Sequence, residues 1–308
     1  MATGHHRTGD RHTSGDRRAD RRTFLTGVLG AGVAASLLGT ACSGATTPST
    51  SAAPATLSGL VAESPFYVAH RGGGGNWPEM TAYAYQQASL IPTLKAIEIS
   101  VCVTADDVLV CSHDPTTARV TGVDYRIRSQ PWSTLQPLMV TSAYTTDPTQ
   151  PARPFTRFDD VAEAHLDRYL AFVEPKTPEA IEPLLARLRV LGQPERVVWK
   201  QPINQPNFAR AKDLGFGTWG YVLDEPGHTY PPRLARFAAA PEIDMLGAPR
   251  VQDDAFVSTV VRAAADNGKK TIMWDIRSVQ DRDRALALGC AGMMTSHLNE
   301  VLGRSATG

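Results

Sequence analysis

Short apolar runs alternate with helical patterns along most of the chain. Eight of these runs have the length of buried strands. They are Phe66–His70, Ala96–Cys102, Tyr169–Glu174, Arg196–Lys200, Phe216–Tyr221, Ile243–Ala248, Lys270–Asp275 and Ala291–Thr295. The alternation of strands with segments that can cross over is typical of an α/β protein with a parallel sheet.

Four of the intervening segments carry helix signals. Met80–Ser89 has apolar residues at helical spacing, and Pro178–Leu191 opens with proline and glutamate. Asp253–Asn267 begins with acids and, like Ser278–Leu288, is followed by a glycine that can end a helix. Eight strands in about 240 residues predict a (β/α)8 TIM barrel. A doubly wound open sheet is the alternative, which periodicity alone does not exclude.

One connection interrupts the alternation. The segment from Pro115 to Arg157 is long and carries scattered Pro and Thr together with Trp132. Long connections in compact domains tend to be functional. We therefore expect an insertion after the second strand that lies over the barrel mouth.

The first residues form a targeting signal. The twin arginines Arg21-Arg22 precede a Gly- and Ala-rich apolar run, Phe24–Leu38, that is too short to span a bilayer. Leu38–Cys42 resembles a lipoprotein cleavage box, although Gly39 is a poor match and leaves ordinary cleavage near Ala41 open. Residues 1–41 are thus expected to be a twin-arginine signal peptide, which predicts export and an extracellular or lipid-anchored location at the cell surface.

Composition divides the rest of the chain. Residues 42–59 form a Ser/Thr/Pro/Ala linker, a possible tether through Cys42, and residues 60–308 form the barrel domain. The net charge is zero, and without the signal peptide it is −3, because residues 1–41 hold six Arg and three Asp. No basic run remains to indicate a nucleic-acid partner.

Two cysteines flank a predicted hairpin turn. If Asp106-Asp107 are its central residues, Cys102 and Cys111 face each other, and export would permit a disulfide. The alternative is a pair of buried thiols.

Chemically useful side chains gather at the predicted strand exits. His70 and Arg71 follow the first strand, Glu98 and Ser100 lie near the end of the second, and His113 closes its hairpin. The next strand exit supplies Glu174 and Lys176. In a barrel of this kind, the carboxyl ends of the strands form the active site.

This inventory suits cleavage of a phosphodiester. His70 and His113 can transfer protons near neutral pH. Glu98 and Glu174 can hold a hard divalent cation, and Arg71 and Lys176 can bind phosphate. Trp274, and also Trp77, can pack against a cationic head group, or they are core aromatics.

The order of these motifs resembles the glycerophosphodiester phosphodiesterase family. The segments that carry the resemblance are His70-Arg71-Gly72, Pro78-Glu79, Thr104-Ala105-Asp106, His113-Asp114 and Glu174-Pro175-Lys176. It implies a TIM-barrel hydrolase that releases an alcohol and glycerol 3-phosphate, uses Ca²⁺ or Mg²⁺, and attacks its first ester with the substrate's own hydroxyl. By the same resemblance His70 and His113 are acid and base, Glu98 and Glu174 are metal ligands, and Glu79 shapes the site.

The chain departs from the family where an Asp is expected. Ser100 stands there, so the site lacks one carboxylate and is expected to bind metal weakly unless Asp114 or water helps. Two alternatives follow: a phospholipase-D-like lyase on the same barrel, and a lipoprotein that binds a phosphorylated ligand without catalysis. The glycines at positions 72–75 permit either close backbone approach to a ligand or a flexible turn.

Overall fold

Eight parallel strands form the framework of the protein. The computed structural model describes residues 56–141, 149–223 and 231–303. The strands of the ring are β1 (Phe66–Ala69), β2 (Ala96–Val103), β6 (Leu170–Pro175), β7 (Val197–Pro202), β8 (Gly217–Tyr221), β9 (Met245–Pro249), β10 (Lys270–Ile276) and β11 (Gly292–Thr295). Each lies within two residues of its predicted bounds.

The ring is closed at β1. This strand pairs in parallel with β11, where Phe66 is opposite Gly292, and also with β2, where Val68 is opposite Ala96. An open sheet would leave β1 or a terminal strand with an unpaired edge. The predicted (β/α)8 barrel is therefore confirmed, and the doubly wound alternative is wrong.

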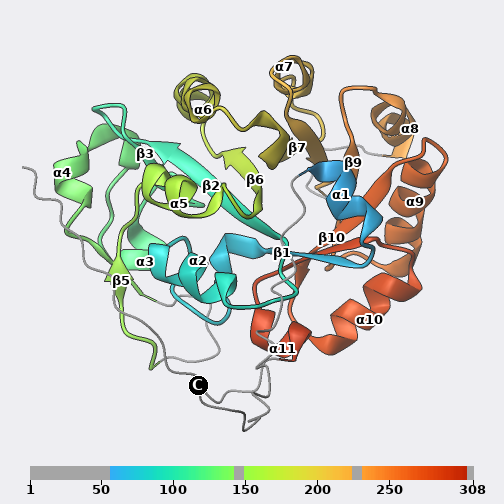
Figure 1. The fold of residues 1–308 in the computed structure, drawn as a ribbon, viewed down its shortest axis with the longest axis horizontal. Helices are drawn as coiled ribbons and strands as arrows, with labels where there is room; N and C mark the ends of the chain where they lie inside the picture. The colour runs from blue at the N-terminus through green and yellow to red at the C-terminus, as the bar shows by residue number, and fades with distance from the viewer. Residues whose placement is uncertain (1–55, 142–148, 224–230, 304–308) are drawn as a thin grey trace, which may run out of the picture. The chain divides into compact units, whose positions relative to one another are not determined.

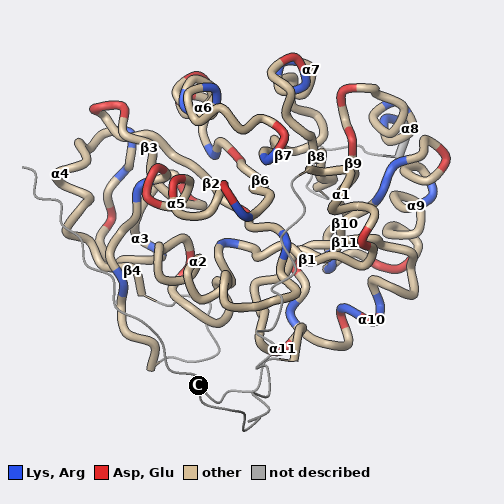
Figure 2. Tube along the Cα trace, viewed as in Figure 1, with Lys and Arg blue, Asp and Glu red and all other residues tan. Residues whose placement is uncertain are grey.

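A helix follows every strand of the ring. These helices are α2 (Ala82–Ser89), α5 (Phe158–His165), α6 (Pro178–Leu191), α7 (Phe208–Asp213), α8 (Pro231–Ala239), α9 (Asp254–Ala265), α10 (Val279–Ala287) and α11 (Leu298–Leu302). Helices α6 to α11 follow one another around the outside of the strands (Figure 1). Positions of both charge signs are interspersed along them (Figure 2). Among the described helices, none combines the length and apolarity that a membrane span requires.

Local sequence signals explain the helix ends. The carboxylate of Asp253 accepts the N–H of Phe256 at the start of α9, and the Ser278 hydroxyl accepts the N–H of Asp281 at the start of α10. Helix α6 opens on Pro178 and ends at Gly192, whose φ of 68° is left-handed. The four predicted helices are confirmed for this reason.

The amino-terminal end of the barrel is closed by helix α1 (Leu57–Ala62). Leu60 is fully buried with Phe66, Phe172 and Trp219, and the rings of Phe172 and Trp219 meet edge to face at 5.8 Å. Helix α1 thus starts three residues before the predicted boundary, because an apolar helix face extends into the segment that composition assigned to the linker.

The insertion after β2 has a small core of its own. Its elements are β3 (Leu109–Cys111), α3 (Ala118–Thr121), the 3₁₀ turn Ile127–Ser129, α4 (Trp132–Leu135), β4 (Met139–Val140) and β5 (Arg153–Pro154). Strand β3 pairs antiparallel with β2 outside the ring. Val120, Ile127, Leu135 and Phe155 pack together against this hairpin. The insertion predicted after the second strand of the ring is therefore confirmed.

The predicted facing of the two hairpin cysteines is wrong. Cys111 is opposite Val101, and Cys102 is opposite Val110. A loop that includes Asp107 at φ 60° shifts the register by one residue, so the two thiols lie on opposite faces of the hairpin. Both are free and buried. Burial raises the pKa of Cys102 to about 12, which keeps it an unreactive thiol.

Candidate active site

The turn after β1 places the first site residues. His70–Gly72 forms a single 3₁₀ turn in which Arg71 has a positive φ of 54°. This conformation is uncommon for a residue with a side chain. It directs the backbone N–H of Arg71 to Glu98 Oε2 at 2.8 Å. The turn therefore fixes His70 and Arg71 against the end of β2.

The glycines that follow serve close packing. A Cβ on Gly73 would lie 2.7 Å from the Trp77 ring, and a Cβ on Gly75 would lie 2.5 Å from the ring of His297. All four glycines are buried, as is Trp77. Gly74 also lines the pocket that contains His70 and Arg71, so close approach of this run to a ligand stays a prediction, whereas Trp77 is a core residue rather than a head-group contact.

Glu98 and Glu174 meet at the centre of the site on a buried lysine. The ammonium of Lys200 donates to Glu98 Oε1 at 3.0 Å and also contacts Glu174 Oε2. Ser100 donates its hydroxyl to Glu98 Oε1 at 2.8 Å. The Tyr221 hydroxyl donates to Glu174 Oε1 at 2.7 Å. These side chains come from the neighbouring strands β2, β6, β7 and β8.

The charges of this cluster stabilise one another. Burial raises the pKa of Glu98, but Lys200, His70 and Arg71 more than offset it, so this pKa lies below its usual value. For Glu174, burial opposes Lys200 and Lys176, and the pKa falls to about 2. Burial lowers the pKa of Lys200, but the two carboxylates raise it above its usual value. All three groups are thus charged at neutral pH.

His70 has a carboxylate behind its ring. Its Nδ1 lies 3.2 Å from Asp275 Oδ1, and both side chains are nearly buried. Asp275 also accepts the backbone N–H of Ser296 at 2.9 Å and its hydroxyl at 2.8 Å. After the cost of burial, His70 and these donors hold the pKa of Asp275 well below its usual range. An ionised Asp275 beside Nδ1 fixes the orientation of the imidazole.

His113 has the same arrangement on the other side. Its Nδ1 lies 2.7 Å from Asp114 Oδ1, and Asp114 in turn accepts from Arg119 Nε at 2.5 Å. Burial lowers the pKa of His113; Asp114 opposes this, but the cations Arg71, Lys176 and Lys200 add to it, and the pKa falls to about 4. His113 is therefore neutral at pH 7, with Nε2 3.5 Å from the ammonium of Lys176.

Glu79 connects the insertion to the first turn. This buried carboxylate accepts from Arg119 Nη1 at 3.0 Å and Nη2 at 2.7 Å, and from Arg71 Nη1 at 3.4 Å. Burial raises the pKa of Glu79, but the two guanidinium groups bring it below its usual value. Glu79 orients Arg71 and anchors the insertion.

Two pockets open on either side of the central cluster. One, of about 170 Å³, is lined by residues of β10 and by residues that follow β1 and β11, and these include His70, Arg71, Trp274 and Asp275. The other, of about 230 Å³, is lined by Glu174, Lys176, Gln201 and Tyr221 among others. The Trp274 ring meets the Tyr221 ring edge to face at 5.3 Å, between the two pockets.

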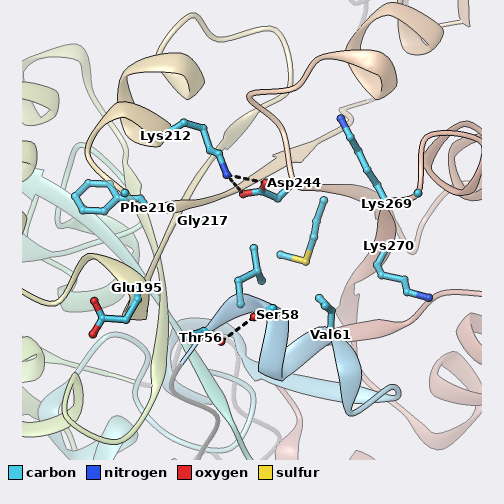
Figure 3. Close-up of a pocket in the computed structure, with 14 residues that line it drawn as sticks. Thr56, Ser58, Val61, Glu195, Lys212, Phe216, Gly217, Asp244, Lys269 and Lys270 are labelled. Atoms are coloured by element: carbon cyan, nitrogen blue, oxygen red, sulfur yellow. Dashed lines mark hydrogen bonds and ion pairs between the residues drawn. The ribbon is translucent and has the colours of Figure 1, made fainter.

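A larger hollow of about 430 Å³ lies at the opposite end of the barrel (Figure 3). It is bordered by helix α1 and by the first residues of strands β8, β9 and β10, among them Gly217, Met245 and Lys270. Lys212 and Asp244 form an ion pair there at 2.9 Å. The predicted site residues are at the other end of the strands, as expected for this architecture.

Every site residue predicted from the sequence lies at the end of the barrel where the carboxyl ends of the strands meet. Sequence reasoning missed four others: Lys200, Tyr221, Asp275 and Arg119. Lys200 directly follows the apolar run Val197–Trp199, and Asp275 ends a predicted strand, so both carried a usable signal. Arg119 had none, because its role depends on how the insertion folds.

The donor set does not fit the divalent cation that the resemblance implies. Members of the family commonly use such a metal, and hard cations take six or more oxygen ligands. Here Glu98 and Glu174 are bonded to Lys200, and Ser100 supplies a hydroxyl in place of a third carboxylate. Within the described residues, no group of three His, Cys, Asp or Glu side chains could hold a metal ion.

The fold and the site together define a class of protein. A closed (β/α)8 barrel carries two histidines, each backed by a carboxylate, around a cluster of cations at the carboxyl ends of its strands. These features are typical of a barrel hydrolase that acts on an anionic substrate.

The chain is similar to the glycerophosphoryl diester phosphodiesterase family. The model of that family matches residues 70–220, which contain both histidines, Glu98, Glu174 and Lys200. The resemblance seen in the sequence is thereby confirmed. No curated protein matches the chain.

Solved structures support the fold. A phosphodiesterase of Oleispira antarctica, in complex with the product sn-glycerol-3-phosphate, is 18% identical with a TM-score of 0.63, covering 79% of this chain and 98% of that one. Glycerophosphodiester phosphodiesterases of Agrobacterium tumefaciens (16% identical, TM-score 0.62, covering 77% and 99%) and Thermotoga maritima (18% identical, TM-score 0.59, covering 77% and 96%) are also similar.

Proposed function

We propose that the protein hydrolyses glycerophosphodiesters to an alcohol and glycerol 3-phosphate. The observation that carries this proposal is the pair of histidines, each with a carboxylate at Nδ1, on opposite sides of a cationic centre. The match to the family model supports the reaction class. The glycerol 3-phosphate complex of the Oleispira antarctica phosphodiesterase supports a small diester as substrate.

His113 is suited to accept the first proton. It is neutral near pH 7 and lies beside Lys176, a candidate phosphate contact. His113 takes the proton from the substrate's free glycerol hydroxyl as its oxygen bonds to phosphorus. His70 gives a proton to the alcohol oxygen as the bond from phosphorus to that oxygen breaks. Arg71 and Lys176 stabilise the charge on the phosphate oxygens.

The second step hydrolyses the cyclic phosphate with the roles exchanged. His70 takes a proton from water, and His113 returns one to the glycerol oxygen. The two pockets accommodate the two parts of the substrate. The pocket with His70 and Trp274 holds the departing alcohol, where the indole ring packs on a cationic head group. The pocket with Lys176 and Gln201 holds the glycerol.

The test is product analysis with the full chain. Glycerophosphocholine and related diesters are expected to release glycerol 3-phosphate and the free alcohol. Accumulation of a cyclic phosphate as the final product would identify a lyase instead. Absence of any product from folded protein, together with tight binding of a phosphorylated ligand, would identify a binding protein.

The pH profile is expected to follow His113. The reaction needs its neutral form, and the pKa in the folded protein is lowered from 6.5 to about 4. The acidic limb of the profile is therefore expected at about pH 4, below which activity is lost. The measurement is kcat/KM against pH in the acidic range. An acidic limb near the usual histidine pKa would contradict the assignment of His113 as base.

We also propose that the protein is exported by the twin-arginine route and anchored through Cys42. Arg21-Arg22 and Leu38–Cys42 support this and lie outside the described residues. Fractionation of cells that express the full chain tests it. The R21K/R22K variant is expected to remain inside the cell, and the C42S variant is expected to be exported without an anchor. Unchanged location of both variants would refute the proposal.

A further inference from the structure

Lys200 lies buried at the centre of the site and contacts more groups than a single ion-pair partner. Its side chain is 7% exposed, and its partners Glu98 and Glu174 are 0% and 3% exposed. The ammonium also lies 5.2 Å from the centre of the Tyr221 ring and 5.8 Å from that of Trp219. Two carboxylates and two aromatic faces thus hold one positive charge in place.

The oxygens of both carboxylates are already bonded. Glu98 accepts from Lys200 and Ser100 at Oε1 and from the backbone of Arg71 at Oε2. Glu174 contacts Lys200 at Oε2 and accepts from Tyr221 and, at 3.0 Å, from Lys176 at Oε1. A divalent cation would have to displace the ammonium of Lys200 from these carboxylates. The ammonium would then lie in a low-dielectric interior, where no third carboxylate of the described residues pairs with it.

Without a metal, this site has the same net charge as a site of three carboxylates with a divalent cation bound. Two carboxylates around one ammonium leave a net charge of −1. Three carboxylates around a divalent cation, the arrangement that the resemblance implies, leave the same net charge. Ser100 removes one negative charge, and Lys200 supplies one positive charge where the cation would supply two. The two changes compensate each other in electrostatic terms.

We propose that the ammonium of Lys200 is the resident cation of this site, and that phosphodiester cleavage here needs no divalent metal. The inference rests on the proposed function. An ammonium has three N–H donors. Two are directed at Glu98 and Glu174, and we assign the third to a non-bridging phosphate oxygen, where it stabilises developing negative charge. Ser100 keeps Glu98 oriented while leaving the net charge matched to a single cation.

The first test uses the unaltered full chain. Release of glycerol 3-phosphate is compared in EDTA, in excess calcium and in excess magnesium, and the rates are expected to agree within about twofold because no bound metal takes part. Calorimetric titration with each metal alone is expected to show no binding. A rate that collapses in EDTA and returns with metal would overturn the role of Lys200 and leave the hydrolase intact.

The second test removes the ammonium. Lys200→Met is expected to lower turnover about 10²–10³-fold, the range for losing a preorganised electrostatic donor, with or without metal. The matched control is Lys95→Met, a buried lysine before β2 whose Nζ lies 3.9 Å from Glu63 Oε2, away from the site. Near-normal turnover of folded Lys200→Met protein would refute the proposal.

The third test converts the site. The S100D/K200M variant restores three carboxylates without the ammonium. It is expected to bind Ca²⁺ or Mg²⁺ in calorimetry and to gain thermal stability from either metal, whereas the parent protein gains none. If the variant fails to fold, the titration of the unaltered chain still decides the question.

The two proposals fail in different ways. If no diester is cleaved under any condition, the proposed hydrolase is wrong. The role of Lys200 as resident cation is then judged by calorimetric titration with each metal alone. Metal binding to the parent chain that disappears in the Glu98→Gln variant refutes this role, and absence of metal binding upholds it.

Discussion

Replacing either histidine of the site by alanine is expected to lower kcat by on the order of 10²–10⁴, the usual contribution of a general acid or base. His70→Ala and His113→Ala each leave the cationic centre and the barrel core in place. The loss should therefore fall on kcat, with a melting temperature close to that of the parent protein. The measurement is steady-state release of glycerol 3-phosphate by each purified variant.

The leaving group separates the two roles. A glycerophosphodiester that releases a nitrophenol needs little protonation of the departing oxygen. With this substrate His70→Ala is expected to regain much of its activity in the first ester cleavage, and His113→Ala is not. The matched control is His165→Gln, a histidine on α5 whose ring lies beside Tyr85 and Tyr169 rather than in the site. Equal recovery of both site variants would contradict the assignment.

Replacing Glu79 by alanine is expected to destabilise the protein by about 3 kcal/mol, because it removes one partner of a buried ion pair. Arg119 and Arg71 both donate to Glu79, so the substitution takes away an acceptor that two guanidinium groups share. Arg71 would also lose its orientation, which is expected to raise KM. The free energy of unfolding in urea and the KM for glycerophosphocholine measure the two effects.

A second glutamate provides the comparison. Glu182 pairs with Arg210 as Glu79 pairs with Arg119, but both partners are largely exposed. Glu182→Ala is expected to change stability far less, since solvent screens an exposed pair. Equal effects of the two substitutions would show that the ions around Glu79 are not a structural link.

The sequence predicted the barrel well because its strands are short and buried on both sides. Each appears as an apolar run between helix signals, and closure follows from their number. The hairpin after β2 was harder. One extra loop residue near Asp107 shifts the register, and no pattern in the run from Ala105 to Val108 distinguishes the two registers.

The site was predicted where chemistry follows strand ends directly. His70, Arg71, Glu174 and Lys176 obey that rule, whereas Glu98 lies within β2, whose later residues pair with β3. Lys200 was overlooked because a lysine near the end of an apolar strand is usually a solvent-exposed terminus. Its burial depends on the carboxylates of β2 and β6, far away in the sequence. The aspartate behind His70 is likewise supplied by a distant strand, β10.

The two faces of the β2–β3 hairpin pack into two different hydrophobic cores. Val101, Val103 and Cys111 belong to the main core, while Cys102 and Val110 belong to the core of the insertion. Changes in the insertion's core are therefore confined to one face of the hairpin. The insertion still reaches the catalytic frame through His113 and Asp114, which follow β3, and through Arg119. Changes in the insertion beyond Arg119 therefore leave the proton-transfer residues in place.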